Sequence, residues 1–166
     1  MNASTAALFK TLTQGVYLIG VAHGERKAIT AAWVMQVSFD PVLLALSINP
    51  LHSSYRLLIE GGAFSVSVLK QEQLALAARF GDRARGDELS EREWTTGSLG
   101  LPVLRDGLAF FECRFLYECP AGDHVLAVGE VVNGKVLDSR AKPLSYRDTG
   151  DMDGASALFP DTLGES

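Results

Sequence analysis

The sequence predicts a mainly β fold, in which a largely antiparallel sheet closes into a barrel and carries a few short helices. Short runs rich in Val, Ile, Leu and Phe recur along the chain, separated by Gly, Pro, Asn and Asp. Most separations have hairpin length, which favours antiparallel pairing of neighbouring strands. Because an open sheet leaves unpaired edges, about seven strands of this kind favour a closed barrel.

The first half of the chain is predicted to hold helices at both ends and strands between them. Ser4 and Thr5 can cap the first helix. Pro41 cannot donate to a ladder, so the strand before it should stop at Phe39 or Asp40. The expected elements are a helix at 6–12, a strand at 16–22, a turn at 23–26, a returning strand at 27–39 that pairs with the first strand, an apolar strand at 42–48 with both faces covered, and a helix at 53–60 that stops at Gly61-Gly62.

The second half is predicted to contain further strands around one charged loop. Residues 82–100 are expected to be the least structured part, anchored by Trp94 and Leu99. Asn133-Gly134 is a strong hairpin signal. The expected elements are a strand at 64–69 with one buried face, a helix at 71–80 closed by Gly81, an edge strand at 101–104, a strand at 108–117, its partner at 124–132, and a strand at 135–137.

Composition indicates an acidic, globular chain of one domain. Its 166 residues carry a formal net charge of −5, and 47% of them are hydrophobic. Phosphate neutralisation needs basic clusters, so we expect no nucleic-acid partner. No apolar run approaches the roughly 18 residues of a membrane span, and the first residues lack the features of a signal peptide. We therefore expect a cytoplasmic protein that enters no membrane, with one domain at 1–150 and a weakly ordered acidic tail at 151–166.

The two cysteines, Cys113 and Cys119, predict neither a disulfide nor a metal site. They share one face of an expected strand but lie too far apart along it to form a bridge. No Cys-x-x-Cys pair or run of His accompanies them, so we expect no metal ion and interpret both as ordinary thiols.

The loop before the helix at 53–60 is a candidate phosphate site. It reads His52-Ser53-Ser54 and follows directly on the apolar strand at 42–48. Hydroxyl groups beside a helix N-terminus can hold a phosphate, because free backbone N–H groups and the positive end of the helix dipole point the same way. The same residues also suit an ordinary helix N-cap, and on this pattern alone the cap is the simpler interpretation.

Three common nucleotide and hydrolase motifs are missing. No two glycines are spaced i, i+2, so the dinucleotide fingerprint Gly-x-Gly-x-x-Gly is absent. The stretch from Gly129 to Lys135 resembles a P-loop, but Val136 replaces the magnesium-binding Ser or Thr and the stretch precedes no helix. No Gly-x-Ser-x-Gly elbow occurs.

Five segments in order resemble the flavin reductase-like proteins over roughly residues 8 to 147. The segments are Thr-Ala-Ala-Trp with Gln-Val-Ser-Phe-Asp-Pro and the Ser-rich loop (30–54), the strand at 62–69, the helix at 73–80, Gly-Asp-His with its strand (122–129), and Pro-Leu-Ser-Tyr (143–146). The resemblance implies the FMN-binding split-barrel fold. Two departures, Ala32 and Val42, leave FMN or FAD as the flavin.

The resemblance also implies which residues bind the flavin. Small residues let the backbone approach a flat ring, and Trp33 would supply a wall. His124, next to Asp123, would lie near flavin and nicotinamide. Trp33 and Phe80 could equally be core aromatics, and His124 a structural residue at the rim. The implied flavin-binding residues are Thr30, Ala31, Ala32, Trp33, Val34, Ser47, Ile48, Asn49, His52, Ser53, Ser54, Phe80 and Arg83, with Arg56 close to the phosphate.

The function implied by the resemblance is an oxidoreductase that passes a hydride from NAD(P)H to flavin. Reduced flavin would then serve oxygen, a partner oxygenase or another acceptor, as in the reductase component of a two-component monooxygenase. A flavoredoxin-like electron carrier without nicotinamide activity is the alternative. A pyridoxamine-phosphate oxidase type is a weaker third reading, since the basic pocket it needs is not apparent. The resemblance also implies a homodimer in which both subunits border each flavin.

Overall fold

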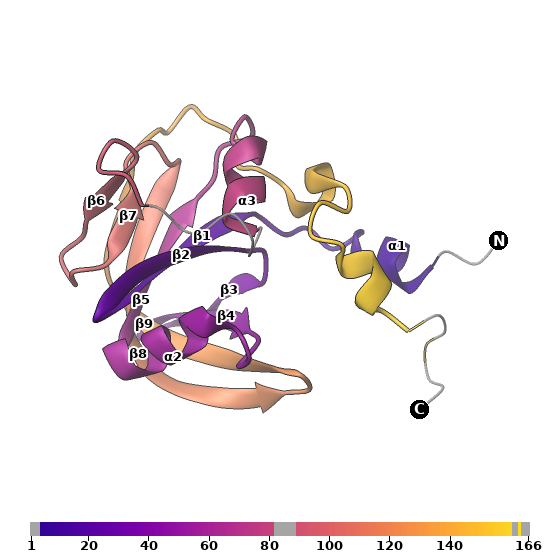
Figure 1. Ribbon diagram of the computed structural model, residues 1–166, viewed down its shortest axis with the longest axis horizontal. Coiled ribbons are helices and arrows are strands. Elements are labelled where there is room, and N and C mark those ends of the chain that lie inside the picture. The colour runs from indigo at the N-terminus through magenta and orange to yellow at the C-terminus, as the bar shows by residue number, and fades with distance from the viewer. Residues whose placement is uncertain (1–3, 82–88, 161–162, 164–166) are drawn as a thin grey trace.

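The protein is built on one antiparallel β-sheet that curls into a barrel (Figure 1). The computed structural model describes residues 4–81, 89–160 and 163. Over these residues, seven strands pair in the order β2-β1-β5-β8-β9-β4-β3, and β6 and β7 pair separately. The predicted fold class, mainly β and antiparallel with a few short helices, is therefore confirmed.

Most elements lie within a few residues of the predicted ranges. Their bounds are α1 (Thr5–Phe9), β1 (Tyr17–His23), β2 (Glu25–Ala31), β3 (Val34–Phe39), β4 (Val42–Ile48), α2 (Ser53–Gly61), β5 (Ala63–Val68), α3 (Leu74–Gly81), β6 (Trp94–Thr96), β7 (Pro102–Leu104), β8 (Ala109–Ala121), β9 (His124–Val136), η1 (Tyr146–Thr149) and η2 (Ala155–Leu158). Strand β3 ends at Phe39 as expected, and the left-handed Gly62 (φ 67°) ends α2. Strand β6, inside the charged loop, was not predicted.

The prediction of a single strand at 27–39 is wrong, because this segment contains two strands, β2 and β3, with a break between them. The break allows the sheet to close into a barrel. Strand β2 pairs with β1 and β3 pairs with β4, so they form the two edges of the sheet. The chain crosses from one edge to the other through Ala32 and Trp33. The Ser47 N–H donates to the Trp33 carbonyl oxygen at 2.9 Å and fixes this corner. The two edge strands are thus connected by this stretch of backbone and not by ladder hydrogen bonds, so a split remains between them in the barrel wall.

The hairpin predicted at Asn133-Gly134 is also wrong, because both residues lie inside β9. Strands β8 and β9 are 13 residues each and pair along their whole length, with the turn at Gly122-Asp123. Asn133 lies opposite Glu112, and its side-chain amide donates to that carboxylate at 2.7 Å. A partner on the neighbouring strand therefore overrides the local turn preference.

Strand β5 is covered on both faces, although its alternating sequence predicts one exposed face. All but the last of its residues are buried, including Ser65 and Ser67. The Ser65 hydroxyl donates to the Pro102 carbonyl oxygen at 2.6 Å, and the Ser67 hydroxyl accepts from the Leu104 N–H at 3.1 Å. The short β6–β7 pair thus lies over this face, and its own polar groups satisfy the serines.

Two hydrophobic cores stabilise the barrel. The inner core includes Phe64, Leu46 and Ile19, all fully buried. The second core includes Phe80 and Trp94, whose rings meet edge to face with centroids 5.3 Å apart. Trp94 thus anchors the charged loop as predicted, since it is 2% exposed.

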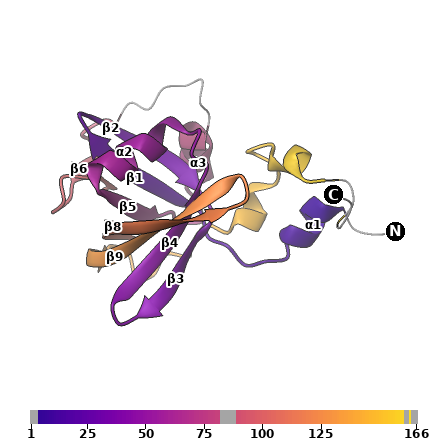
Figure 2. The ribbon, with the colours of Figure 1, turned by 90° about the horizontal axis from the view of Figure 1, so that it is seen from below.

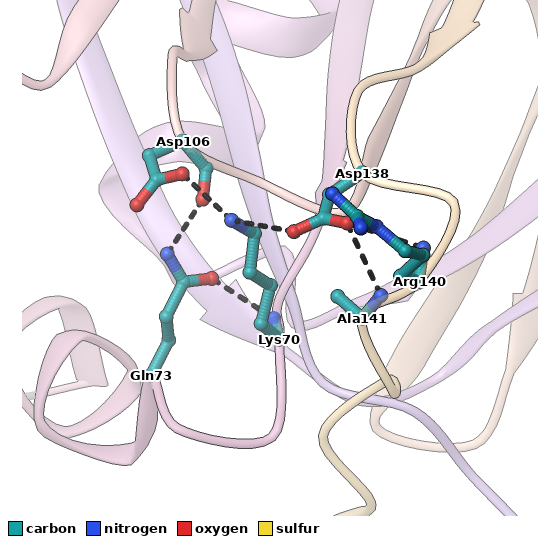
Figure 3. Close-up of polar contacts among 6 residues, drawn as sticks. All are labelled: Lys70, Gln73, Asp106, Asp138, Arg140 and Ala141. Atoms are coloured by element: carbon teal, nitrogen blue, oxygen red, sulfur yellow. Dashed lines mark hydrogen bonds and ion pairs between the residues drawn. The ribbon is translucent and has the colours of Figure 1, made fainter.

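A buried lysine ties the end of β5 to two later loops (Figure 3). The Lys70 ammonium lies 2.6 Å from the Asp106 carboxylate and 3.3 Å from that of Asp138. The hydrogen bond to Asp106 outweighs the effect of burial and raises the pKa of Lys70. The Asp138 carboxylate also accepts the backbone N–H groups of Arg140 and Ala141, which orders the start of the chain's return toward β1.

The two ends of the chain lie side by side beyond the barrel, as Figures 1 and 2 both show. The Phe9 and Phe159 rings stack at 5.2 Å between centroids, and the Lys10 ammonium donates to the Gly150 carbonyl oxygen at 2.7 Å. The described part of the tail contains η2. The division into a domain at 1–150 and a weakly ordered tail at 151–166 stays a prediction.

The most demanding polar site of the fold is the fully buried carboxylate of Glu112. It accepts hydrogen bonds from the Ser98 N–H (2.9 Å), the Ser98 hydroxyl (2.7 Å), the Leu99 N–H (2.9 Å) and Asn133. A Cβ at Gly97 would collide with the carboxylate, so glycine is needed there. Burial alone would raise the pKa of Glu112, but these donors hold it below its ordinary value.

We expect Glu112→Gln to lower the free energy of unfolding by roughly 2–4 kcal/mol, because an amide NH₂ would face buried donors. Urea denaturation at pH 7 measures this, with the exposed Glu72→Gln as control. Since the folded pKa is depressed, the stabilisation is complete above the unfolded carboxyl pKa of about 4.3 and is lost as pH falls through the folded value. The difference between wild type and variant should therefore shrink in acid. Equal stability at pH 7 would contradict this account.

Candidate functional site

A cleft of about 310 Å³ lies at the split of the barrel, between the end of β2 and the end of β4. The cleft is lined by Ile29, Thr30, Ala31, Ala32, Trp33, Leu46, Ser47, Ile48, Asn49, His52, His124, Tyr146, Asp153, Ala155 and Leu158. Three elements distant in the chain thus meet here: the β2–β3 corner, the end of β4 with its following loop, and the first residue of β9. The residues after Tyr146 complete the wall.

The structure brings nine of the predicted site residues together at this cleft. They are Thr30, Ala31, Ala32, Trp33, Ser47, Ile48, Asn49, His52 and His124. Ala32 and Trp33 lie outside both flanking strands, so this part of the wall is a backbone corner, and Ala31 and Ala32 carry small side chains there. A flat ligand can approach such backbone closely.

The other predicted residues do not line this cleft. Val34 packs against the inner core, and Phe80 belongs to the second core, with its ring against Trp94. Ser54 is fully buried, and none of the described residues forms a hydrogen bond with its hydroxyl. Ser53 lies beside the cleft at the start of α2, and Arg83 lies outside the described residues. Phe80 is therefore a core aromatic, the alternative weighed from the sequence.

The helix cap at α2 is His52 and not a serine. The His52 Nδ1 atom accepts a hydrogen bond from the Ser54 N–H at 3.2 Å. Ser53 therefore occupies the first helical position, where it is exposed. The Lys27 ammonium lies 3.4 Å from this hydroxyl, within reach of an anion bound at the helix start.

Lys27 is a site residue that sequence reasoning missed. It lies on β2 two residues before Ile29 and four before Ala31, which both line the cleft. Side chains at alternate positions of a strand share a face, so Lys27 lies on the same face of β2 as these two cleft residues. In the sequence, only the alternation of side chains along the strand could have indicated the position of Lys27. That pattern does not identify Ser53 as its neighbour.

Trp33 and His124 form the aromatic side of the cleft. Their rings lie 5.1 Å apart between centroids at an interplanar angle of 57°. The His124 Nδ1 atom is 2.8 Å from the Asp123 carboxylate, and this hydrogen bond lowers the pKa of Asp123. The carboxylate therefore orients the imidazole ring at the rim.

Thr30 contributes to the cleft mainly through its backbone. Its hydroxyl donates to the Ala77 carbonyl oxygen at 2.6 Å and so ties β2 to α3. A second cavity of about 520 Å³ lies on this side of Thr30, toward α3, and shares Ala31, Ala32, Tyr146 and Asp153 with the cleft.

The residues after Tyr146 are the larger omission from the sequence prediction. Tyr146, Asp153, Ala155 and Leu158 all line the cleft. Their Gly- and Asp-rich sequence predicts a weakly ordered tail, and no local signal points to the barrel. The position of these residues depends on contacts with elements that are far away in the sequence.

The described residues contain no cluster of His, Cys, Asp and Glu suited to a metal ion. No helix among them is both long and apolar enough to cross a membrane. What the cleft offers is a slot with a backbone corner and an aromatic side, and the Lys27 ammonium lies near it beside Ser53. Such a slot suits a flat ring that carries a phosphate.

Comparison with known proteins agrees with this geometry. The family model described as the flavin reductase like domain matches residues 9–155. The NADH-dependent FMN reductase AsuE2 of Streptomyces nodosus subsp. asukaensis is 35% identical over 81% of this chain and 75% of its own length. The ferric-chelate reductase (NAD(P)H) of Archaeoglobus fulgidus is 32% identical over 84% of this chain and 85% of its own length.

Solved structures share the fold. BorF, the flavin reductase component of a bacterial two-component tryptophan halogenase, superposes with a TM-score of 0.77 at 28% identity, over 83% of this chain and 94% of its own. The chain therefore belongs to the flavin reductase-like family and has its split-barrel fold.

Proposed function

We propose that the cleft at the barrel split is where NAD(P)H reduces the flavin. The chain is a flavin reductase-type oxidoreductase that uses NAD(P)H, in keeping with its family and with relatives named as NADH- or NAD(P)H-dependent reductases. The single observation that carries the location is the convergence of Ala31, Ala32 and Trp33 with the loop from Asn49 to Ser53.

The residues present fit a flavin mononucleotide. Lys27 and Ser53 mark one end, and Ala31 lies four residues along β2, about 13 Å away at the rise of an extended strand. Ribityl phosphate joined to a ring needs a span of this order. Lys27, Ser53 and the start of α2 would hold the phosphate, while Ala31, Ala32 and Trp33 would border the ring.

When bound, flavin would supply the redox chemistry, as the acceptor of one hydride from NAD(P)H together with one proton from solvent. The protein's residues position the partners and limit water. His124, held by Asp123, stands at the open rim, where it would contact the nicotinamide. Trp33 keeps the histidine ring in place through its own ring.

The final electron acceptor is proposed from the relatives. BorF is the reductase component of a two-component enzyme, and by analogy reduced flavin would pass to a partner oxygenase or to another acceptor. FMN is the proposed flavin, with FAD the alternative. We place this reaction in the cytoplasm, where NAD(P)H is supplied. The flavoredoxin-like carrier remains the competing outcome of the tests below.

A homodimer is proposed from the exposed apolar side chains of β3 and β4. Phe39 is 88% exposed, and Met35, Val37 and Val42 are also exposed apolar side chains on this edge hairpin. An unpaired edge with apolar side chains is normally covered, and a second copy is the proposed cover.

We expect the purified protein to bind added FMN and to oxidise NADH or NADPH in its presence, because the cleft would hold both reactants. Visible absorbance, followed on addition of each nucleotide, measures binding and bleaching. Protein that binds FMN and is bleached by dithionite but by neither nucleotide would establish the carrier. Protein that binds no flavin would contradict the proposal.

Removal of the Lys27 charge tests the phosphate end. We expect Lys27→Met to weaken FMN binding by about tenfold, because a charge-assisted contact to phosphate is lost. Binding of riboflavin, which lacks the phosphate, should change little. Titration by flavin fluorescence measures both, with the exposed Lys135→Met as control. Equal loss for both ligands would contradict a phosphate role.

The dimer proposal predicts a mass of two chains by light scattering at micromolar concentration. Phe39→Lys should shift the protein toward monomer, because a charge would enter the covered apolar surface. Val136→Lys, at another exposed apolar position (60%), should leave the mass unchanged. A wild-type monomer would refute the homodimer.

A further inference from the structure

The residues after Leu144 form a wall shared by two cavities, and we call residues 146–158 the C-terminal wall. Tyr146 and Asp153 line both the cleft at the split and the larger cavity beside α3. Thr149 and Met152 face only the larger cavity, and Ala155 only the cleft. The wall therefore stands where a second reactant would enter beside the bound flavin.

Hydrogen bonds hold the C-terminal wall in one arrangement. The Tyr146 N–H donates to the Gln14 carbonyl oxygen at 2.8 Å, and the Tyr146 hydroxyl donates to the Asp153 carboxylate at 2.8 Å. The Asp151 carboxylate accepts from the Ser156 N–H and hydroxyl at 3.0 and 2.6 Å. Burial, together with Asp153, raises the pKa of Tyr146, so the phenol stays a donor at neutral pH. The Tyr146 hydroxyl thus fixes the position of the Asp153 carboxylate.

The charge of this wall is negative. Asp153 is an acidic side chain in both cavities, and no Lys or Arg occurs among the described residues that line them. Lys27, which lies beside Ser53 near the start of α2, lines neither cavity. The site is therefore polarised, with a cation where the flavin phosphate is proposed and a carboxylate where the nicotinamide nucleotide would enter.

NADH and NADPH differ at one group, the 2′-phosphate on the adenosine ribose of NADPH. Nucleotide sites commonly accept the 2′-hydroxyl of NADH with a carboxylate and bind the 2′-phosphate of NADPH with an arginine. A carboxylate near that phosphate repels it, and in a partly exposed site this repulsion is screened by salt.

We propose that Asp153 selects NADH over NADPH by facing the ribose of the incoming dinucleotide. This inference rests on the proposed function and adds a specificity-determining residue to it. Tyr146 is its positioning residue, since its hydroxyl holds the carboxylate at the cavity wall. Discrimination acts on binding, because the 2′-phosphate takes no part in hydride transfer.

The test compares the ratio of kcat/KM for NADH to that for NADPH, with saturating FMN. We expect Asp153→Asn to lower this ratio about tenfold through a smaller KM for NADPH, with kcat nearly unchanged. The amide oxygen of the new residue can still accept the Tyr146 hydrogen bond, so the wall should keep its arrangement. Asp148→Asn removes the same charge from an exposed residue that lines neither cavity, and it should leave the ratio unchanged.

Two further readouts separate charge from shape. Raising the salt concentration should lower the wild-type ratio but not that of Asp153→Asn. Tyr146→Phe removes the hydroxyl that holds the carboxylate but keeps the charge, so it should lower the ratio by less than Asp153→Asn does. A wild-type enzyme that prefers NADPH, or a ratio that Asp153→Asn and Asp148→Asn change equally, would overturn the proposal. Failure to oxidise either nucleotide would instead refute the proposed function itself.

Discussion

Closure of the barrel without a ladder between its two edges is the constraint on which the site depends. Strands β2 and β3 end the sheet on opposite sides, yet they follow one another in the chain. The backbone must therefore turn a corner through Ala32 and Trp33, outside regular pairing. A corner of this kind leaves a slot in the wall and backbone that a flat molecule can approach. The cleft is thus a consequence of how the sheet closes.

Buried charged groups organise the segments that the barrel itself does not hold. Glu112 collects the donors of the 97–99 loop and of Asn133, and Lys70 joins the end of β5 to Asp106 and Asp138. Each group is satisfied by several partners, as a buried charge must be. After Asp138 the chain runs back past β1 to the cleft. The contacts of Asp138 with Lys70 and with the following backbone therefore help to position the C-terminal wall.

The proposed site would work by position and charge. Lys27 lies beside Ser53, Asp153 lies beside Tyr146, and the rings of Trp33 and His124 lie together at the cleft. Such an arrangement matches a family in which the flavin performs the chemistry and the protein aligns two nucleotides.

The sequence by itself determined the fold class, the β4 strand, the stop of α2 at Gly62, and nine residues that meet in the cleft. These features depend on local periodicity, on turn chemistry and on an ordered family pattern, all of which are present in the chain. The tertiary structure alone decided the break at Ala32, the place of Asn133 inside β9, the core position of Phe80, and the entry of Lys27 and Asp153 into the site. Each of these depends on a partner far away in sequence, and contact energies between distant residues outweigh the local preferences that a sequence displays.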